Sequence, residues 1–137
     1  MSYIKDEILK AANVLHLSVL ELTQVESLFI IDQIVAKYAK GKRDNFLWEN
    51  FVEKNVISND KDAWKLIKDI IGKEEVIMFF NPEDESTALQ FCSGNDVVAL
   101  LSETFGFEFY LTNKTTDYVL CFNHHDYLIA SGNISTP

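Results

Sequence analysis

The sequence predicts an α+β fold, in which N-terminal helices pack on a C-terminal, mostly antiparallel sheet of four to six strands with one helix inserted. Three observations support this prediction. Apolar residues up to about residue 72 recur at helical spacing, those from Val76 onward follow strand patterns, and Ser93 opens a further helical stretch. The 137 residues are expected to form a single domain, with a helical part at about 1–72 and a sheet part at about 73–137.

The first part of the chain contains two clear helical patterns. In residues 3–16, apolar side chains repeat at spacings of four, three and four, which places them on one helix face. Residues 23–26 fit a capping box, in which Thr23 and Glu26 satisfy each other's backbone N–H groups. The helix that follows is expected to end at Gly41 and to turn inward Val25, Leu28, Ile31, Val35 and Tyr38.

Two shorter helices are expected before residue 73. Residues 42–45 are typical of a loop, and residues 46–52 are interpreted as a short helix. Asp60 is expected to cap a further helix that ends at Gly72. Its inward residues would be Trp64, Ile67 and Ile71.

The second part of the chain changes to strand patterns. Residues 76–80 are apolar on both faces, as a central strand covered on both sides would be. A turn at 81–86 and a strand at 88–92 follow, and Ser93 then caps a helix that runs through Phe105 and closes at Gly106. Three strands complete the sheet at about 107–112, 117–122 and 127–131, and Trp64 and Phe109 are expected in the core.

Alternation along these last strands predicts their register. A turn at 113–116 sets Thr112 opposite Asp117, so that Phe107, Phe109 and Leu111 share the core face. A turn at 123–126 then adds Tyr127 and Ile129 to that face. The other face would hold Glu108, Tyr110, Asp117, Val119, Cys121, Leu128 and Ala130. Either a helix covers part of this mixed face, or it is a binding surface rimmed by carboxylates.

The net charge of −9 is unevenly distributed. Residues 1–72 carry 10 Lys/Arg against 11 Asp/Glu, a balance of −1, whereas residues 73–137 carry 2 against 10, a balance of −8. An acidic half cannot replace phosphate counterions, which excludes nucleic acid, and an anionic membrane surface is disfavoured for the same reason. The acidity serves either solubility alone or the recognition of a basic protein partner.

Other features restrict the cellular setting. The longest apolar run has five residues, too few to span a membrane, and the first residues contain no secretory signal, which predicts a cytoplasmic protein. The two cysteines, Cys92 and Cys121, do not form a disulfide framework, and Cys121 is expected to be a small buried hydrophobe.

One cluster has chemical potential, at residues 123–126 beside Cys121. Two imidazoles and a carboxylate could bind Zn²⁺, and a Cys–His pair could act as a nucleophile, but a polar hairpin turn explains the same residues. The five glycines form no phosphate-binding loop. We therefore expect no metal, no cofactor and no enzymatic activity.

The strand Gly106-Phe107-Glu108-Phe109-Tyr110-Leu111-Thr112 and the turn Phe122-Asn123-His124-His125-Asp126 carry a family resemblance. They resemble the closing strand and turn of small bacterial immunity-type proteins, the partners of polymorphic or contact-dependent growth-inhibition toxins. The resemblance covers roughly residues 73–132. It implies an inhibitor that binds and blocks a toxin domain without chemistry of its own.

Charge and register then indicate which residues would meet the partner. The expected contact residues are Glu83, Asp84, Glu85, Glu108, Tyr110 and Asp117, with Tyr110 as the aromatic anchor between two acids. The partner would be a basic toxin domain, and the protein a monomer or weak homodimer. The alternatives are a small metal-binding domain or hydrolase centred on Cys121, His124, His125 and Asp126, or a non-catalytic homodimeric adaptor.

Overall fold

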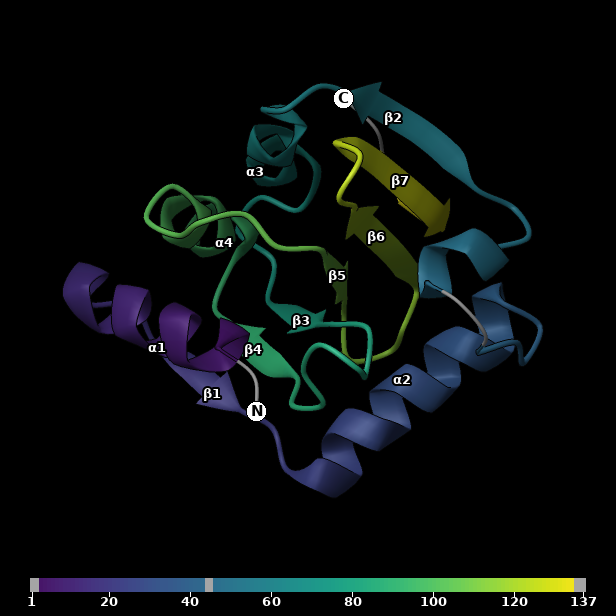
Figure 1. Ribbon diagram of the computed structural model, residues 1–137, viewed down its shortest axis with the longest axis horizontal. Helices are drawn as coiled ribbons and strands as arrows, with labels where there is room; N and C mark the ends of the chain where they lie inside the picture. Colours follow the sequence, from purple (N-terminus) through teal and green to yellow (C-terminus); the bar gives the residue numbers. More distant parts are fainter. Residues whose placement is uncertain (1–2, 44–45, 135–137) are drawn as a thin grey trace.

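The computed structural model describes residues 3–43 and 46–134 and shows the predicted α+β fold (Figure 1). The helices are α1 (Ile4–Leu15), α2 (Gln24–Tyr38), α3 (Ile67–Ile70) and α4 (Gly94–Leu101), with the 3-10 helices η1 (Leu47–Asn50) and η2 (Ala63–Leu66). The strands are β1 (Val19–Glu21), β2 (Asn55–Asn59), β3 (Val76–Phe79), β4 (Leu89–Phe91), β5 (Phe109–Thr112), β6 (Tyr118–Phe122) and β7 (Tyr127–Gly132).

The described strands form one seven-stranded antiparallel sheet in the order β1-β4-β3-β5-β6-β7-β2. Helices cover both of its faces, with α1, α3 and α4 on one side and α2 on the other (Figure 1). Each side has its own apolar core, one built on Ile8, Ile67 and Leu100, the other on Ile34 and Val35.

Strand β3 confirms the expectation of an interior strand. Val76 and Met78 contribute to the core under α1, α3 and α4, whereas Ile77 and Phe79 contribute to the core under α2. All four are at most 2% exposed, and β3 pairs with β4 and β5. An apolar run without alternation is thus explained by helices on both sides of the sheet.

The helix starts predicted at Thr23 and Ser93 are confirmed, whereas the start predicted at Asp60 is wrong, because η2 begins at Ala63 after Asp62. Thr23 Oγ1 accepts from the Glu26 backbone N–H at 3.1 Å, and Glu26 Oε1 accepts from the Thr23 N–H at 2.8 Å. Ser93 Oγ accepts from the Asp96 N–H at 3.0 Å. The hydrogen bonds from Thr23 hold the pKa of the Glu26 carboxyl below its ordinary value.

The predicted inward face of α2 is partly wrong. The residues that α2 buries are Ser27, Ile30, Ile31, Ile34 and Val35. Val25 is 78% and Leu28 49% exposed, and Tyr38 is half-buried. The rotation of the helix has a polar reason, because Ser27 Oγ faces the sheet and accepts from the Ala88 N–H at 2.9 Å. Apolar residues surround most of α2, so their spacing alone does not select the buried side.

Strands β1 and β2 were not expected, which explains why the sheet has seven strands rather than four to six. They form its two edges. Strand β2 pairs with β7 across a bulge between Val56 and Ser58. The helix predicted after Asp60 is split into η2 and α3 before Gly72, and its Trp64 is half-buried against the core rather than within it.

Two other segments differ from their predicted bounds. Helix α4 ends at Leu101, before Gly106, because the Ser102 and Thr104 hydroxyls bond to carbonyls of the last turn. Phe105 is 81% exposed and lies outside the helix. The short helix expected at 46–52 is confirmed as η1, whereas the loop expected at 42–45 lies partly outside the described residues.

The register between β5 and β6 is shifted by two residues from the predicted one. Phe109 pairs with Phe122 and Leu111 with Leu120. A shift of two residues preserves the sheet faces, so the predicted separation of core and second face is retained for these strands. It also places Glu108 opposite Asn123 rather than Cys121.

The register between β6 and β7 differs by one residue, which reverses the predicted faces of β7. Leu128 and Ala130 lie on the face of Phe109, whereas Ile129 pairs with Cys121. The turn is shorter than predicted because Asp126 adopts a left-handed conformation with a φ of 64°. Such a residue closes a three-residue hairpin loop.

Among the described residues no helix is long and apolar enough to cross a membrane.

Candidate functional site

The turn between β3 and β4 carries three of the predicted contact residues. Glu83 and Asp84 are exposed, and neither forms an ion pair with another described residue. Glu85 is only 8% exposed, and its Oε2 accepts from the Thr87 N–H at 2.9 Å. Glu83 and Asp84 therefore remain surface carboxylates, whereas Glu85 stabilises the turn.

Tyr110 does not lie on an exposed surface, which corrects its predicted position. It is 0% exposed and stacks on Phe79 with ring centroids 5.0 Å apart. Burial raises the pKa of its hydroxyl well above the ordinary value, so the group stays a phenol. Of the two interpretations of the mixed sheet face, the structure supports coverage, because α2 and η1 pack over Tyr110.

Asp117 lies at the other end of the sheet from Glu108, with the whole of β5 between them. Its Oδ2 accepts from Thr115 Oγ1 at 2.7 Å and from Asn113 Nδ2 at 3.0 Å, which lowers the pKa of this exposed carboxyl. The structure therefore brings Glu83, Asp84 and Glu108 to one end of the sheet and leaves Asp117 outside that group.

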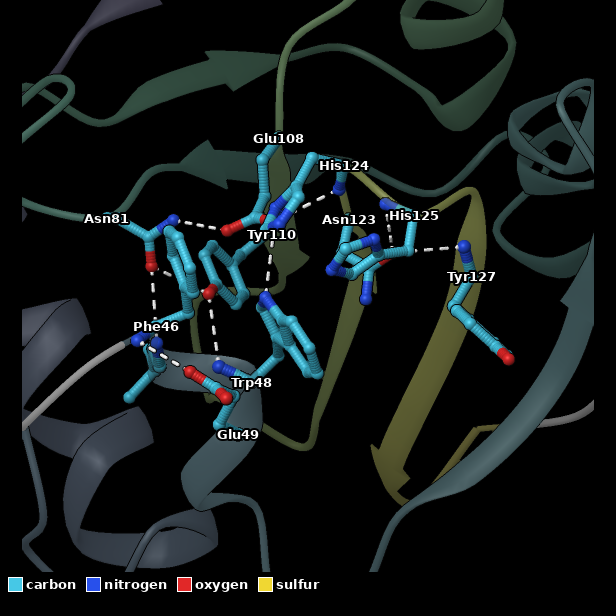
Figure 2. A network of polar contacts seen from close by, with 11 residues as sticks. Phe46, Trp48, Glu49, Asn81, Glu108, Tyr110, Asn123, His124, His125 and Tyr127 are labelled. Carbon is cyan, nitrogen blue, oxygen red and sulfur yellow. Dashed lines mark hydrogen bonds and ion pairs between the residues drawn. The ribbon is translucent and has the colours of Figure 1, made fainter.

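Glu108 is the centre of a buried polar network (Figure 2). Its side chain is 6% exposed. Oε1 accepts from Trp48 Nε1 at 3.1 Å and from the His124 N–H at 3.1 Å, and Oε2 accepts from Asn81 Nδ2. A buried carboxylate requires such donors to replace the water it has lost.

Asn81 links this carboxylate to η1. Its Oδ1 accepts from the Tyr110 hydroxyl at 2.7 Å and from the Leu47 N–H at 3.2 Å, while the Tyr110 oxygen accepts from the Trp48 N–H at 3.1 Å. The network therefore ties η1 to the ends of β3 and β5 (Figure 2).

His124 contributes its ring as well as its backbone. Its Nδ1 lies 2.7 Å from Glu108 Oε1, and because a carboxylate oxygen only accepts, Nδ1 carries the proton. The ring is 4.8 Å from the ring of Phe46 between centroids and 6.3 Å from that of Trp48. Glu108 thus orients an imidazole whose side chain is 43% exposed.

Asn123 shapes the turn that presents His124. Its Oδ1 accepts from the backbone N–H groups of His125 and Tyr127, both at 3.0 Å, which determines the orientation of the amide. Its Nδ2 is buried without a hydrogen-bond partner among the described residues. The turn geometry is therefore obtained at the cost of one unsatisfied donor.

An open hollow of about 500 Å³ lies beside the network. It is lined by residues from five segments of the chain, among them Tyr3, Phe46, Glu83, Asp84, Glu108 and His124. Phe46 is 41% exposed, so an aromatic ring and two free carboxylates stand around a buried third carboxylate. Such an arrangement favours a ligand that is cationic and partly flat.

The predicted cysteine and histidine cluster is not assembled as a reactive pair. Cys121 is fully buried in the core under α2, and burial raises the pKa of its thiol, which disfavours the nucleophilic thiolate. Within residues 3–43 and 46–134, no group of three or more His, Cys, Asp and Glu side chains is placed to hold a metal ion.

Sequence reasoning missed Phe46, Trp48 and Asn81 as members of the site. They lie in a short helix and at the end of a strand, and Trp48 and Asn81 meet Glu108 over sequence separations of 60 and 27 residues. One usable signal was Glu108 itself, since a carboxylate on a largely apolar strand face requires donors from elsewhere in the chain.

Fold and site together define an α+β protein with helices on both sheet faces and an acidic, aromatic hollow at one sheet end. The chain belongs to a family of unknown function, DUF6756, which matches residues 2–136. Comparison with the curated proteins and with the solved structures found no match.

Proposed function

We propose that the protein is a cytoplasmic, non-catalytic immunity protein that binds and neutralises a basic protein, the toxin domain of a cognate bacterial toxin. The observation that carries this proposal is the pair of exposed, unpaired carboxylates of Glu83 and Asp84 at the mouth of the hollow. Complementary charge steers a basic partner to such a surface.

The distribution of lysines supports the same surface. Residues 73–137 contain two lysines, and both belong to the opposite end of the sheet. Lys73 precedes β3, and Lys114 lies in the β5–β6 turn, where it pairs with Glu75 at 3.3 Å. No lysine of residues 73–137 therefore neutralises Glu83 and Asp84. Lys5 of α1 lines a hollow with them, but its ammonium pairs with Glu21 at 3.0 Å.

One observation favours the alternative of a metal-binding or hydrolytic site. The Glu108 carboxylate accepts a hydrogen bond from His124 Nδ1. In metal sites and in catalytic triads, a carboxylate orients the ligand or general-base histidine through the same contact. A hydrolase would need a nucleophile or metal beside the His124 ring. Cys121, the nucleophile that the sequence suggested, is enclosed in the core, so the proposal of a binding protein has the stronger support.

The test uses the basic C-terminal domain of the toxin-like protein encoded immediately upstream, if such a reading frame exists. We expect the two proteins to co-purify and the association rate to fall steeply with added salt, as the Debye length shortens to ~3 Å at 1 M.

Single charge reversals then locate the contact. Glu83→Lys and Asp84→Lys should each slow association at low salt, whereas Glu74→Lys and Asp117→Lys at the far end should not. Absence of binding, or wild-type kinetics for all four variants, would contradict the proposal.

A further inference from the structure

We propose that the hollow receives the guanidinium group of one arginine side chain of the partner, an inference that rests on the proposed function. In this arrangement Glu83 and Asp84 form ion pairs with the guanidinium at the mouth of the hollow. The Phe46 ring stacks on it, and Glu108 accepts a hydrogen bond from it at the floor. The structural basis is the combination of a buried carboxylate, an exposed ring and two unpaired surface acids around one hollow.

The carboxylate of Glu108 has unused hydrogen-bonding capacity. An ionised carboxylate offers about four acceptor positions, two on each oxygen. Among the described residues, Oε1 accepts from Trp48 and from the backbone and ring of His124, whereas Oε2 accepts only from Asn81. Because Glu108 lines the hollow while its side chain is 6% exposed, one N–H donor can complete Oε2 from the hollow side.

A second feature of Glu108 is the negative charge of its carboxylate. The donors around Glu108 are an indole, an amide, a backbone N–H and the imidazole of His124, and no described lysine or arginine pairs with it. His125, Glu83 and Asp84 are the other titratable groups near His124. A buried carboxylate is best compensated by a cation, and a guanidinium from outside the chain can supply one.

The aromatic lining of the hollow favours arginine over lysine. The ring of Phe46 is 41% exposed at the mouth and lies nearly parallel to Trp48, with an interplanar angle of 10°. A guanidinium is planar, stacks on aromatic faces and presents several donors to separate carboxylates. The ammonium of lysine is compact and strongly hydrated, so it stacks less favourably on the Phe46 ring and bridges fewer of the carboxylates.

The hollow has a suitable size. Its volume of about 500 Å³ lies within the usual range of ligand pockets, roughly 300–1,000 Å³. Tyr3, which is 64% exposed, forms part of its lining.

The experiment uses the full chain and three small probes, N-acetyl-arginine amide, its lysine counterpart and the neutral isostere N-acetyl-citrulline amide. The readout is the NMR resonance of the Trp48 indole N–H, which reports on Glu108. We expect a saturable shift with the arginine probe, weaker binding of the lysine probe by about fivefold, and no saturable shift with citrulline.

Variants localise the binding. Asp84→Asn and Phe46→Ala should each weaken binding of the arginine probe by about threefold or more, whereas the matched control Glu74→Gln should not. Equal shifts with citrulline, or unchanged binding in both variants, would overturn the inference.

The outcomes separate the two proposals. If the arginine probe binds in the hollow but the upstream toxin domain does not bind the protein, the proposed function fails while the guanidinium site stands. If the toxin domain binds Phe46→Ala and Asp84→Asn as tightly as the wild type, the guanidinium site fails while the function stands.

Discussion

At one end of the sheet the carboxylate of Glu108 is enclosed by donors from three other segments, whereas at the other end Asp117 lies exposed in its own turn. Sequence reasoning selected both residues by the same criteria of charge and sheet face. Their surroundings differ because η1 covers the Glu108 end, while at the Asp117 end α2 contacts the turn through Lys37.

The contacts of α2 at the Asp117 end make the difference clear. Lys37 Nζ donates to Thr116 Oγ1 at 2.7 Å and to the Thr115 carbonyl at 3.0 Å, and the Tyr38 hydroxyl donates to the Thr116 carbonyl at 2.8 Å. These hydrogen bonds hold the backbone of the turn, and the carboxylate of Asp117 stays exposed to solvent. A covering segment, not the strand, therefore decides whether an acidic side chain has a structural role.

The largest effect is expected from removing the buried acid. Glu108→Ala leaves the donors of Trp48, Asn81 and His124 unpaired in the protein interior, so the free energy of unfolding should fall by about 3 kcal/mol. Urea denaturation measures the change. Asp117→Ala is the control and should change the unfolding free energy far less. Equal effects of the two substitutions would contradict the claim that only the Glu108 end is held by its acid.

A comparable test at the Asp117 end concerns the backbone rather than the acid. Gly132 has a φ of 91°, and a Cβ there would meet the Asp117 carbonyl and the Tyr38 hydroxyl, both at 2.7 Å. Gly132→Ala should therefore cost about 2 kcal/mol of unfolding free energy. Gly106→Ala, where a Cβ meets nothing within 4 Å, should have nearly wild-type thermal stability.

A smaller effect is expected inside the network. Tyr110→Phe removes one donor to Asn81 and one acceptor for the Trp48 N–H, which should lower the free energy of unfolding by about 1 kcal/mol. The matched control is Tyr3→Phe, because the Tyr3 side chain is 64% exposed. A null result for Tyr110→Phe would mean that η1 is held by apolar packing alone.

The smallest effect is expected in the pH dependence of stability, through the carboxyl group of Asp117. Hydrogen bonds from Thr115 and Asn113 lower the pKa of folded Asp117 below its ordinary 3.8. The resulting stabilisation is complete above that value and is lost as the pH falls through the lower, folded pKa. Thr115→Ala should raise the midpoint of Asp117 in a carboxyl ¹³C NMR titration, and an unchanged midpoint would contradict this assignment.

Local signals predicted much of the fold. The capping box at Thr23 and the cap at Ser93 depend on residues within one helical turn, and the burial of β3 follows from its composition. The β5–β6 register was missed by two residues because side chains alternate with a period of two. A shift of two therefore leaves the hydrophobic pattern unchanged.

The β6–β7 turn was missed for a different reason. Its length depends on Asp126 adopting a left-handed conformation, which aspartate tolerates without requiring it. Glu83, Asp84 and Glu108 could be selected from charge, yet their neighbours could not. Phe46 and Trp48 reach the site by tertiary packing, which no local spacing encodes.

The pairing of β2 with β7 has a consequence for synthesis on the ribosome. Strand β2 is Asn55–Asn59, whereas its neighbour β7, Tyr127–Gly132, follows all the other described strands in the sequence. At a translation rate of ~5–20 residues per second, the residues of β2 remain without their partner strand for several seconds. The bulge between Val56 and Ser58 belongs to the β2–β7 pair, so it forms only when β7 has been made and the two strands meet.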